Sequence, residues 1–235
     1  MFWYNLLNNE REITVITPII GIGFIILERI IPDQVLLKSK NWYVRVLIVN
    51  LLQLAIVILA SFTWDIWFLN WQLFTINSLP SYIEGFFSYV IVTFIFYWWH
   101  RFRHTVNIFW LLFHQVHHSP QRIETITSFY KHPVEIVVNS LLISTINYLL
   151  LGLSVESAAW CLLYASIGEY FYHMNIKTPQ WVGYVFQRPE MHRIHHERGK
   201  HFNNFSDFPL WDMLFGTYSN PKTYNGKCGF TPNRE

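Results

Sequence analysis

The feature that most limits what this chain can fold into is a series of long stretches without a charged side chain. A helix needs about 20 apolar residues to cross a bilayer, and about 17 at the least. The sequence therefore predicts an all-α, polytopic membrane bundle of four to five spanning helices. The stretches are Ile13–Leu27, Val46–Trp64, Gly85–Trp99, Ile136–Val155 and a shorter one, Ser157–Gly168.

Two of these stretches, the second and the fourth, are long enough to span without help. The first and third need flanking Glu28 or His100 at the membrane boundary, and the last needs extension through Phe171. A further uncharged segment, residues 66–83, contains Asn70 and Pro80, and we expect it to be an interfacial or re-entrant connection.

The composition agrees with a membrane protein. Hydrophobic residues make up 52% of the 235 and charged residues 14%, against about 25% charged in soluble domains. A net charge of +2 argues against a nucleic-acid partner, and Cys161 and Cys228 are too few for a disulfide framework or a thiolate metal site. Without an internal repeat or a linker, residues 1–235 are predicted to form a single domain.

The basic residues predict how the bundle sits in the membrane. Residues 28–45, 100–135 and 173–235 contain all of the 17 Lys and Arg residues except Arg11. Because short loops rich in Lys and Arg stay in the cytosol, these segments are predicted to be cytosolic. Every histidine then lies on the cytosolic side or at its boundary, in a helical cap. The membrane would be a bacterial inner membrane or the endoplasmic reticulum.

Histidines are the main chemical signal in the chain, which has eleven of them. Residues at i, i+3 and i+4 share one face of a helix, and neutral imidazole is a ligand for iron, copper, nickel and zinc. At this histidine frequency about 0.02 HxxHH patterns are expected by chance, and two occur. A single histidine would be an ordinary interfacial side chain, but this set predicts a metal site. The clusters are His100 with His104, His114 with His117 and His118, and His192 with His195 and His196.

A ninth histidine, His173, is predicted at the cytosolic end of the last span. Glu169 lies four residues earlier on the same helical face, where its carboxylate would orient His173. The chain has no Glu-x-x-His pair, which argues against a ferritin-like carboxylate site. A histidine-rich divalent-metal transporter is the alternative from another class, but transporters usually place such ligands in mid-span rather than at span ends.

The histidine clusters and the residues around them resemble the fatty acid hydroxylase superfamily, which includes sterol desaturases and lipid hydroxylases. The resemblance covers about residues 90–220. Its motifs are Tyr97-Trp-Trp-His-Arg-Phe-Arg-His104, Trp110-Leu-Leu-Phe-His-Gln-Val-His-His-Ser119, Lys131-His-Pro-Val-Glu135, His173-Met-Asn175, Met191-His-Arg-Ile-His-His196, Asn204, and Trp211-Asp-Met-Leu-Phe-Gly-Thr217.

This resemblance implies a membrane-bound, O2-dependent, non-heme di-iron oxygenase that hydroxylates a lipid C–H bond, with a lipid or sterol desaturase as the alternative. It implies two Fe ions, O2 as co-substrate, a membrane lipid substrate, and an external reductase with a small electron carrier. By analogy, the ligands would be His100, His104, His114, His117, His118, His173, His192, His195 and His196.

Carboxylates near the iron ions would offset part of their charge. Asp212 is the first choice because it lies in a matched motif. His132 precedes Pro133 at the start of a span, and we expect a structural or headgroup role for it; His201 is also expected not to be a ligand. The full set of candidate carboxylates is Glu169, Glu190, Glu197, Asp207 and Asp212.

Overall fold

The structure, a computed structural model, describes residues 10–231 and is helical. Within that range the only β-type pairing is an isolated bridge between Glu197 and Cys228. Arg234, which the orientation argument counts, lies outside the described residues, as does the side chain of Arg11.

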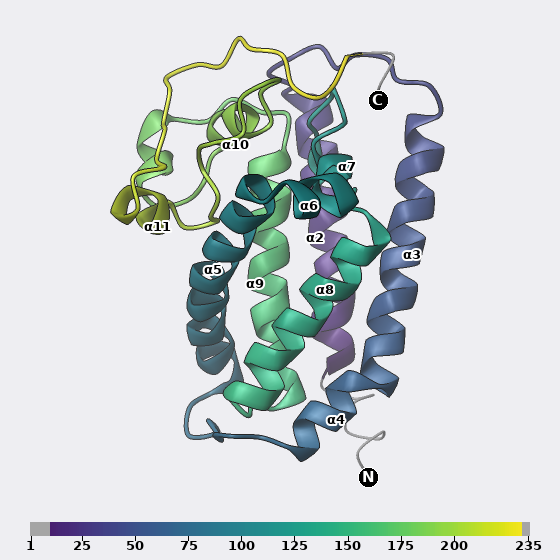
Figure 1. Cartoon of the computed structure of the whole chain (residues 1–235), viewed down its shortest axis with the longest axis vertical. Coiled ribbons are helices and arrows are strands. Elements are labelled where there is room, and N and C mark those ends of the chain that lie inside the picture. The colour runs from purple at the N-terminus through teal and green to yellow at the C-terminus, as the bar shows by residue number, and fades with distance from the viewer. Residues whose placement is uncertain (1–9, 232–235) are drawn as a thin grey trace.

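Long helices form an upright bundle (Figure 1). Helix α9 is central, because both α5 and α2 pack against it, while α3 packs against α8. A π-helix, η3, continues α8 towards the end of the bundle. The bounds are α2 Glu10–Ile30, α3 Trp42–Phe62, α5 Ser81–Thr105, α8 Pro133–Ser144, η3 Thr145–Leu150 and α9 Val155–His173.

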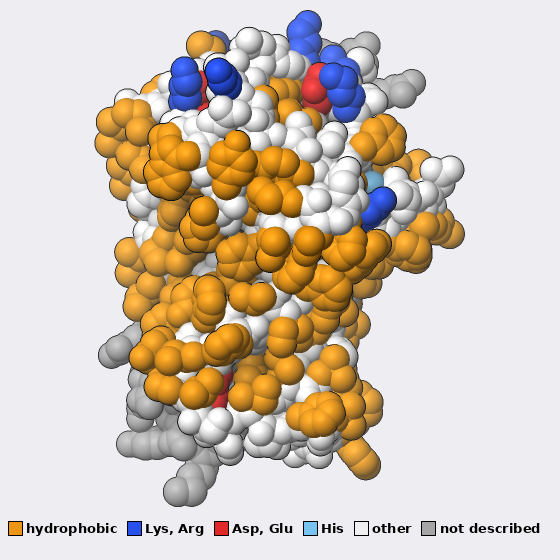
Figure 2. Space-filling view, turned by 90° about the vertical axis from the view of Figure 1, so that its left-hand side faces the viewer, with side chains coloured by type: hydrophobic (Ala, Val, Ile, Leu, Met, Phe, Trp, Pro, Cys, Tyr) orange, Lys and Arg blue, Asp and Glu red, His pale blue; other side chains and the backbone are white. Residues whose placement is uncertain are grey.

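Short helical segments cap one end of this bundle, at the top of Figure 1, whereas α4 lies at the other end. In Figure 2, Lys and Arg side chains gather near the capped end and hydrophobic side chains cover most of the surface below. The bounds are α4 Trp64–Asn70, α6 Asn107–Phe109, η1 Trp110–His114, α7 Gln115–His117, η2 Thr125–Thr127, η4 Gln180–Tyr184, α10 Pro189–His195 and α11 Pro209–Leu214.

Three helical segments of the described chain are long and apolar enough to cross a membrane: Trp42–Asn70, Ser81–Thr105 and Pro133–Leu150. Helices α2 and α9, which the sequence counts as spans, lie in the same bundle but are not among these three. Over residues 10–231 the chain is therefore all-helical with three candidate spans, and the count of four to five remains a prediction.

The uncharged segment 66–83 does not form a further spanning helix. Its first part is α4, and the rest is an extended connection whose backbone hydrogen-bonds to the end of η3, from Leu73 N to Leu149 O and from Ile76 N to Leu151 O. Gly152 has a φ of 58°, and a Cβ there would lie 1.8 Å from the Phe74 carbonyl oxygen, so only glycine fits.

Two buried carboxylates fasten the cap to the bundle. Glu28, at the end of α2, accepts hydrogen bonds from Thr125 and from the Asn175 backbone. Glu124 accepts from Trp42 Nε1 at 2.8 Å and pairs with Arg29. Glu28 is thus fully buried at its helix end and positions the loops that carry the histidines.

Candidate metal centre

The three histidine clusters and His173 come from five elements that meet under the cap. His100 and His104 lie on the last turns of α5, and His173 ends α9. The second cluster spans η1 and α7, and the third lies on α10 and its C-cap. Helical spacing aligns each cluster, but only the packing of these elements brings the clusters together.

The nine histidines form two groups whose ligand atoms lie within 4.8 Å of one another in each group. The groups are adjacent, because the rings of His118 and His196, one from each, stack at 4.2 Å. The division does not follow the clusters along the chain. The first group is His100, His104, His114, His118 and His195, and the second is His117, His173, His192 and His196.

Five of the imidazoles are held through their Nδ1 atoms by an oxygen of the surrounding chain. An Nδ1–H that donates to a carbonyl or carboxylate fixes the tautomer and leaves Nε2 free to bind a metal. The oxygens are Phe205 O for His100 (2.8 Å), Asn203 O for His195 (2.8 Å), Tyr130 O for His117 (3.2 Å), Glu169 O for His173 (2.8 Å) and Glu135 Oε1 for His114 (3.0 Å).

The arrangement of the ring nitrogens fits bound metal. Nitrogens at right angles on one ion, with bonds of about 2.1 Å, lie about 3 Å apart. The Nε2 atoms of His104 and His114 are 2.9 Å apart, and His192 Nε2 is 3.0 Å from both His173 Nε2 and His196 Nε2.

Buried nitrogens without a hydrogen-bond partner support the same conclusion. Among the residues that the structure describes, they include His100 Nε2, His195 Nε2 and both ring nitrogens of His118. A buried polar atom left without a partner is destabilising. A metal ion held by the first group would give these lone pairs a partner.

Burial keeps the histidines neutral, as ligands must be. It lowers the pKa of His195 from 6.5 to about 3. Burial likewise holds the pKa of His114, His117, His118, His192 and His196 well below the usual value. Metal therefore does not have to displace protons from these side chains at neutral pH.

Asp212 holds a loop that contacts one of the histidines. Its carboxylate accepts hydrogen bonds from Phe205 N (2.8 Å), Ser206 N (3.1 Å) and Thr217 Oγ1 (2.6 Å). The carbonyl of Phe205 holds His100, so Asp212 fixes the loop that orients this imidazole.

Glu169 contacts His173 in a different way from the one that its spacing suggests. The backbone carbonyl of Glu169 holds His173 Nδ1, as the i, i+4 geometry of α9 allows, while its carboxylate pairs with Lys131 Nζ at 2.9 Å. The ion pair with Lys131 therefore holds the Glu169 carboxylate away from the His173 ring.

Glu135 is the acidic residue that the sequence reasoning missed. Its carboxylate contacts His114 Nδ1 and pairs with Arg103, and both Glu135 and Arg103 are buried. A signal was present, since Glu135 is a lone acid at the start of an apolar helix next to a matched His-Pro pair. Such a charge needs a partner in the interior.

The remaining candidates contact other partners. Glu190 pairs with Arg188 and Glu197 with Lys200, and Asp207 accepts from Tyr89 Oη at 3.1 Å. His132 is the N-cap of α8, where its ring accepts from Val134 N. The ring centroid of His201 lies 4.9 Å from that of Trp110, with the two rings tilted by 40°, and His201 stands outside both histidine groups.

One cavity lies among the histidines, and a larger apolar cavity adjoins it. The small one, of about 40 Å³, is lined by His100 and His114 from the first group and by His117 and His192 from the second. The apolar one, of about 350 Å³, lies among α2, α5 and α9. Asp207 lines both cavities, and burial raises its pKa to about 7.

The fold and the site together define an all-helical membrane-type protein with a histidine-lined candidate metal centre. The fatty acid hydroxylase family profile matches residues 85–217, more than half of the chain. The chain therefore belongs to the fatty acid hydroxylase family, as the motifs indicate.

Individual relatives are lipid-modifying oxidoreductases by name. The sphingolipid C4-hydroxylase of Schizosaccharomyces pombe is 28% identical over 160 residues, covering 63% of this chain and 52% of the relative. Human alkylglycerol monooxygenase is 27% identical over 156 residues (63% and 34%). The ornithine lipid hydroxylase OlsE of Rhizobium tropici is 26% identical over 149 residues (62% and 44%). The matched region thus spans about half or less of each relative. No solved structure matches the chain.

Proposed function

We propose that this chain is a membrane-bound oxygenase that hydroxylates a lipid C–H bond at a non-heme di-iron centre. The observation that carries the proposal is the meeting of two histidine groups beside an apolar cavity in a membrane-type bundle. Two iron ions, when bound, would supply the O2 activation and the C–H oxidation that amino-acid side chains do not perform.

The protein's own residues would hold and orient the metals. The nine histidines would be the ligands, five of them fixed through Nδ1 by chain oxygens. The Arg103–Glu135 pair would hold His114, and Asp212 would hold the loop behind His100. At a pKa of about 7, Asp207 would exchange a proton near neutral pH beside the small cavity.

A hydrocarbon chain fits the apolar cavity of about 350 Å³, which is within the usual size range of ligand pockets. Its walls are Phe24, Phe86, Ile167, Phe171, Phe186 and Phe208, and its inner end reaches Tyr172, Gln187 and Asp207. The last three also line the small cavity at the histidines. A lipid chain in this cavity would present a C–H bond to the centre. The relatives' names, which refer to sphingolipid, alkylglycerol and ornithine lipid, support a lipid substrate.

The proposal also covers the source of the electrons and the side of the membrane on which the centre lies. The sequence contains no flavin, nicotinamide or heme motif, so a separate reductase and electron carrier would provide two electrons. The distribution of basic residues supports a cytosolic cap with four to five spans, so the centre would face cytosolic donors.

Comparative lipid mass spectrometry tests this function. Cells that express the gene under ¹⁸O2 are compared with cells that express the His118→Ala variant. We expect a lipid heavier by one ¹⁸O atom only with the intact chain, and two metal ions per purified chain. A product lighter by two hydrogens would identify a desaturase instead. No changed lipid, together with at most one metal ion after iron reconstitution, would overturn the proposal.

A further inference from the structure

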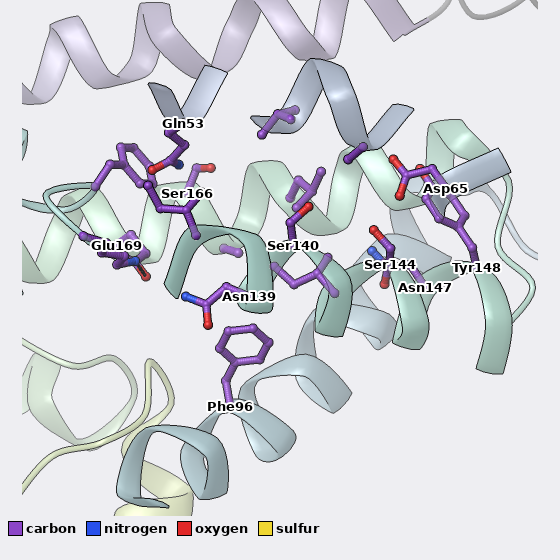
Figure 3. A pocket seen from close by; sticks show the side chains of 18 of the residues that line it. Gln53, Asp65, Phe96, Asn139, Ser140, Ser144, Asn147, Tyr148, Ser166 and Glu169 are labelled. Carbon is purple, nitrogen blue, oxygen red and sulfur yellow. Dashed lines mark hydrogen bonds and ion pairs between the residues drawn. The ribbon is translucent and has the colours of Figure 1, made fainter. Parts of the chain in front are cut away.

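A second large cavity, the polar cavity, adjoins the small histidine-lined cavity, and its walls carry many polar side chains among apolar ones. This cavity of about 210 Å³ lies among α3, α8 and α9 (Figure 3). It runs from Asp65 on α4 to Glu169 on α9, with Ser144 beside Asp65 and Ser140 between the two ends (Figure 3). It shares Arg103, Lys131 and Glu169 with the small histidine-lined cavity.

Three polar atoms on its walls are buried without a partner in the described chain: Gln53 Oε1, Asp65 Oδ1 and Glu169 Oε2. Inside a membrane-spanning bundle there is no bulk water to satisfy such atoms, and leaving them bare is strongly unfavourable. Internal water is expected where a cavity is polar and has more than about 10–15 Å³ of free volume, and this one far exceeds that threshold.

We infer that this polar cavity is a water-filled path between the α4 end of the bundle and the histidine centre. Asp65 is only half-buried, so the cavity reaches the bundle surface at that end. The two cavities that adjoin the centre then have different roles. The apolar cavity takes the lipid chain, and the polar cavity takes water.

That water is present in the cavity does not depend on the proposed function. A role for this water in turnover does rest on it. Hydroxylation converts RH, O2, two protons and two electrons from the external donor into ROH and H2O. Each turnover therefore consumes protons and releases a water molecule at a centre surrounded by apolar helices. A line of ordered water through the cavity would provide the route for both. Desaturation releases two water molecules, so the path would serve that chemistry equally.

Cysteine accessibility tests the path without reference to activity. In the full-length purified chain carrying Cys161→Ala and Cys228→Ala, a cysteine is placed at Ser140 or, separately, at Ser166, another lining position. The matched control is Leu54→Cys on the facing helix α3, where the side chain is 55% exposed on the lipid-facing surface. The probe is a charged, water-soluble methanethiosulfonate, which reacts with thiolate in water.

We expect both cavity cysteines to react at least about tenfold faster than the control, because thiolate forms only where water solvates it. Adding Ser144→Leu, which fills the path between Asp65 and Ser140, should slow the reaction at Ser140→Cys to near the control rate. If both cavity cysteines react no faster than Leu54→Cys, the cavity is not hydrated and the inference is wrong. Rapid reaction in a chain that makes no lipid product would retain the path and reject the proposed function.

Discussion

At the scale of single residues, five of the nine candidate ligands are positioned by a chain oxygen that holds their Nδ1 atom. His195 is held by the Asn203 carbonyl and His100 by the Phe205 carbonyl, so one short loop orients two imidazoles of the first group. Losing even an outer partner of a metal ligand typically weakens binding about 10–100-fold. Losing a ligand should therefore have a larger effect.

Replacing His195 by alanine should lower the metal content of the purified chain and abolish product. Membrane expression should be kept, because the apolar helices are unaffected. His132→Ala is the matched control, since His132 caps α8 outside both groups and should retain two metals and turnover. Metal-to-protein ratios and product yields are measured on the same preparations. A His195→Ala chain with two metals and near-normal activity would refute the ligand assignment.

The buried histidines also predict how the metal-free protein responds to pH. The pKa of His195 is about 3 in the folded chain and near 6.5 when unfolded, so the unfolded chain binds more protons between these values. Its contribution to stability is complete above pH 6.5 and is lost as the pH falls towards 3. Burial raises the pKa of Asp207 to about 7 and of Asp212 to about 6. These two carboxyl groups therefore bind protons more readily in the folded chain, and their contribution to folding stability increases as the pH falls. The loss of stability from the six buried imidazoles is larger than the gain from these two carboxyl groups.

We therefore expect the melting temperature of the metal-free protein to fall as the pH is lowered from about 7 to about 5. Thermal unfolding in detergent across that range is the measurement. An unchanged or higher melting temperature at pH 5 would show that the histidines are not buried as neutral groups.

At the scale of elements, the segment between α10 and α11 is a support for the centre. Replacing Asp212 by asparagine puts an NH2 group against a backbone N–H, because Asp212 accepts from both Phe205 N and Ser206 N. The loop should shift, and because it orients His100, metal binding should weaken about 10–100-fold. Competition with a chelator measures this loss, and unchanged metal affinity would remove Asp212 from its supporting role. Asp65→Asn, on the distant helix α4, is the control.

Helix packing depends on a close approach between α5 and α9. A Cβ on Gly85 would lie 2.5 Å from Trp160 Cβ and 2.6 Å from the Ser157 carbonyl oxygen, so Gly85→Ala should force the helices apart. Overpacking of this kind costs about 1–3 kcal/mol. Gly23→Ala on α2 is the control, because nothing lies within 4 Å of its added Cβ. Melting temperatures should separate the two variants, and an equal effect of both would contradict the packing argument.

At the scale of the whole molecule, the short elements that carry the histidines lie towards the capped end in Figure 1, and Lys and Arg side chains on the face shown in Figure 2 gather near the same end. If that end is cytosolic, cysteines placed at Ser219 or Gln121 should escape an impermeant label applied to intact cells. A cysteine at Ser78, in the connection at the other end, should be labelled. Labelling at Ser219 or Gln121 would reverse the orientation and separate the centre from cytosolic electron donors.

The sequence by itself determined the helical class, the membrane character and the family. It could do so because apolar runs and i, i+3, i+4 spacing are local properties of a chain. It also singled out the nine histidines, whose role as ligands remains a prediction. Only the tertiary structure divided them into two groups that cut across the clusters, placing His117 with His173 and His118 with His195.

The tertiary structure likewise decided which acids support the centre. It placed Glu135 beside His114, paired the Glu169 carboxylate with Lys131, and brought the loop at Phe205 into hydrogen bonding with Asp212. Spacing within one helix cannot predict such partners, because they come from elements far apart in the chain. Which carboxylate meets which imidazole is set by how α5, α8, α9 and α10 pack, and no local pattern records that packing.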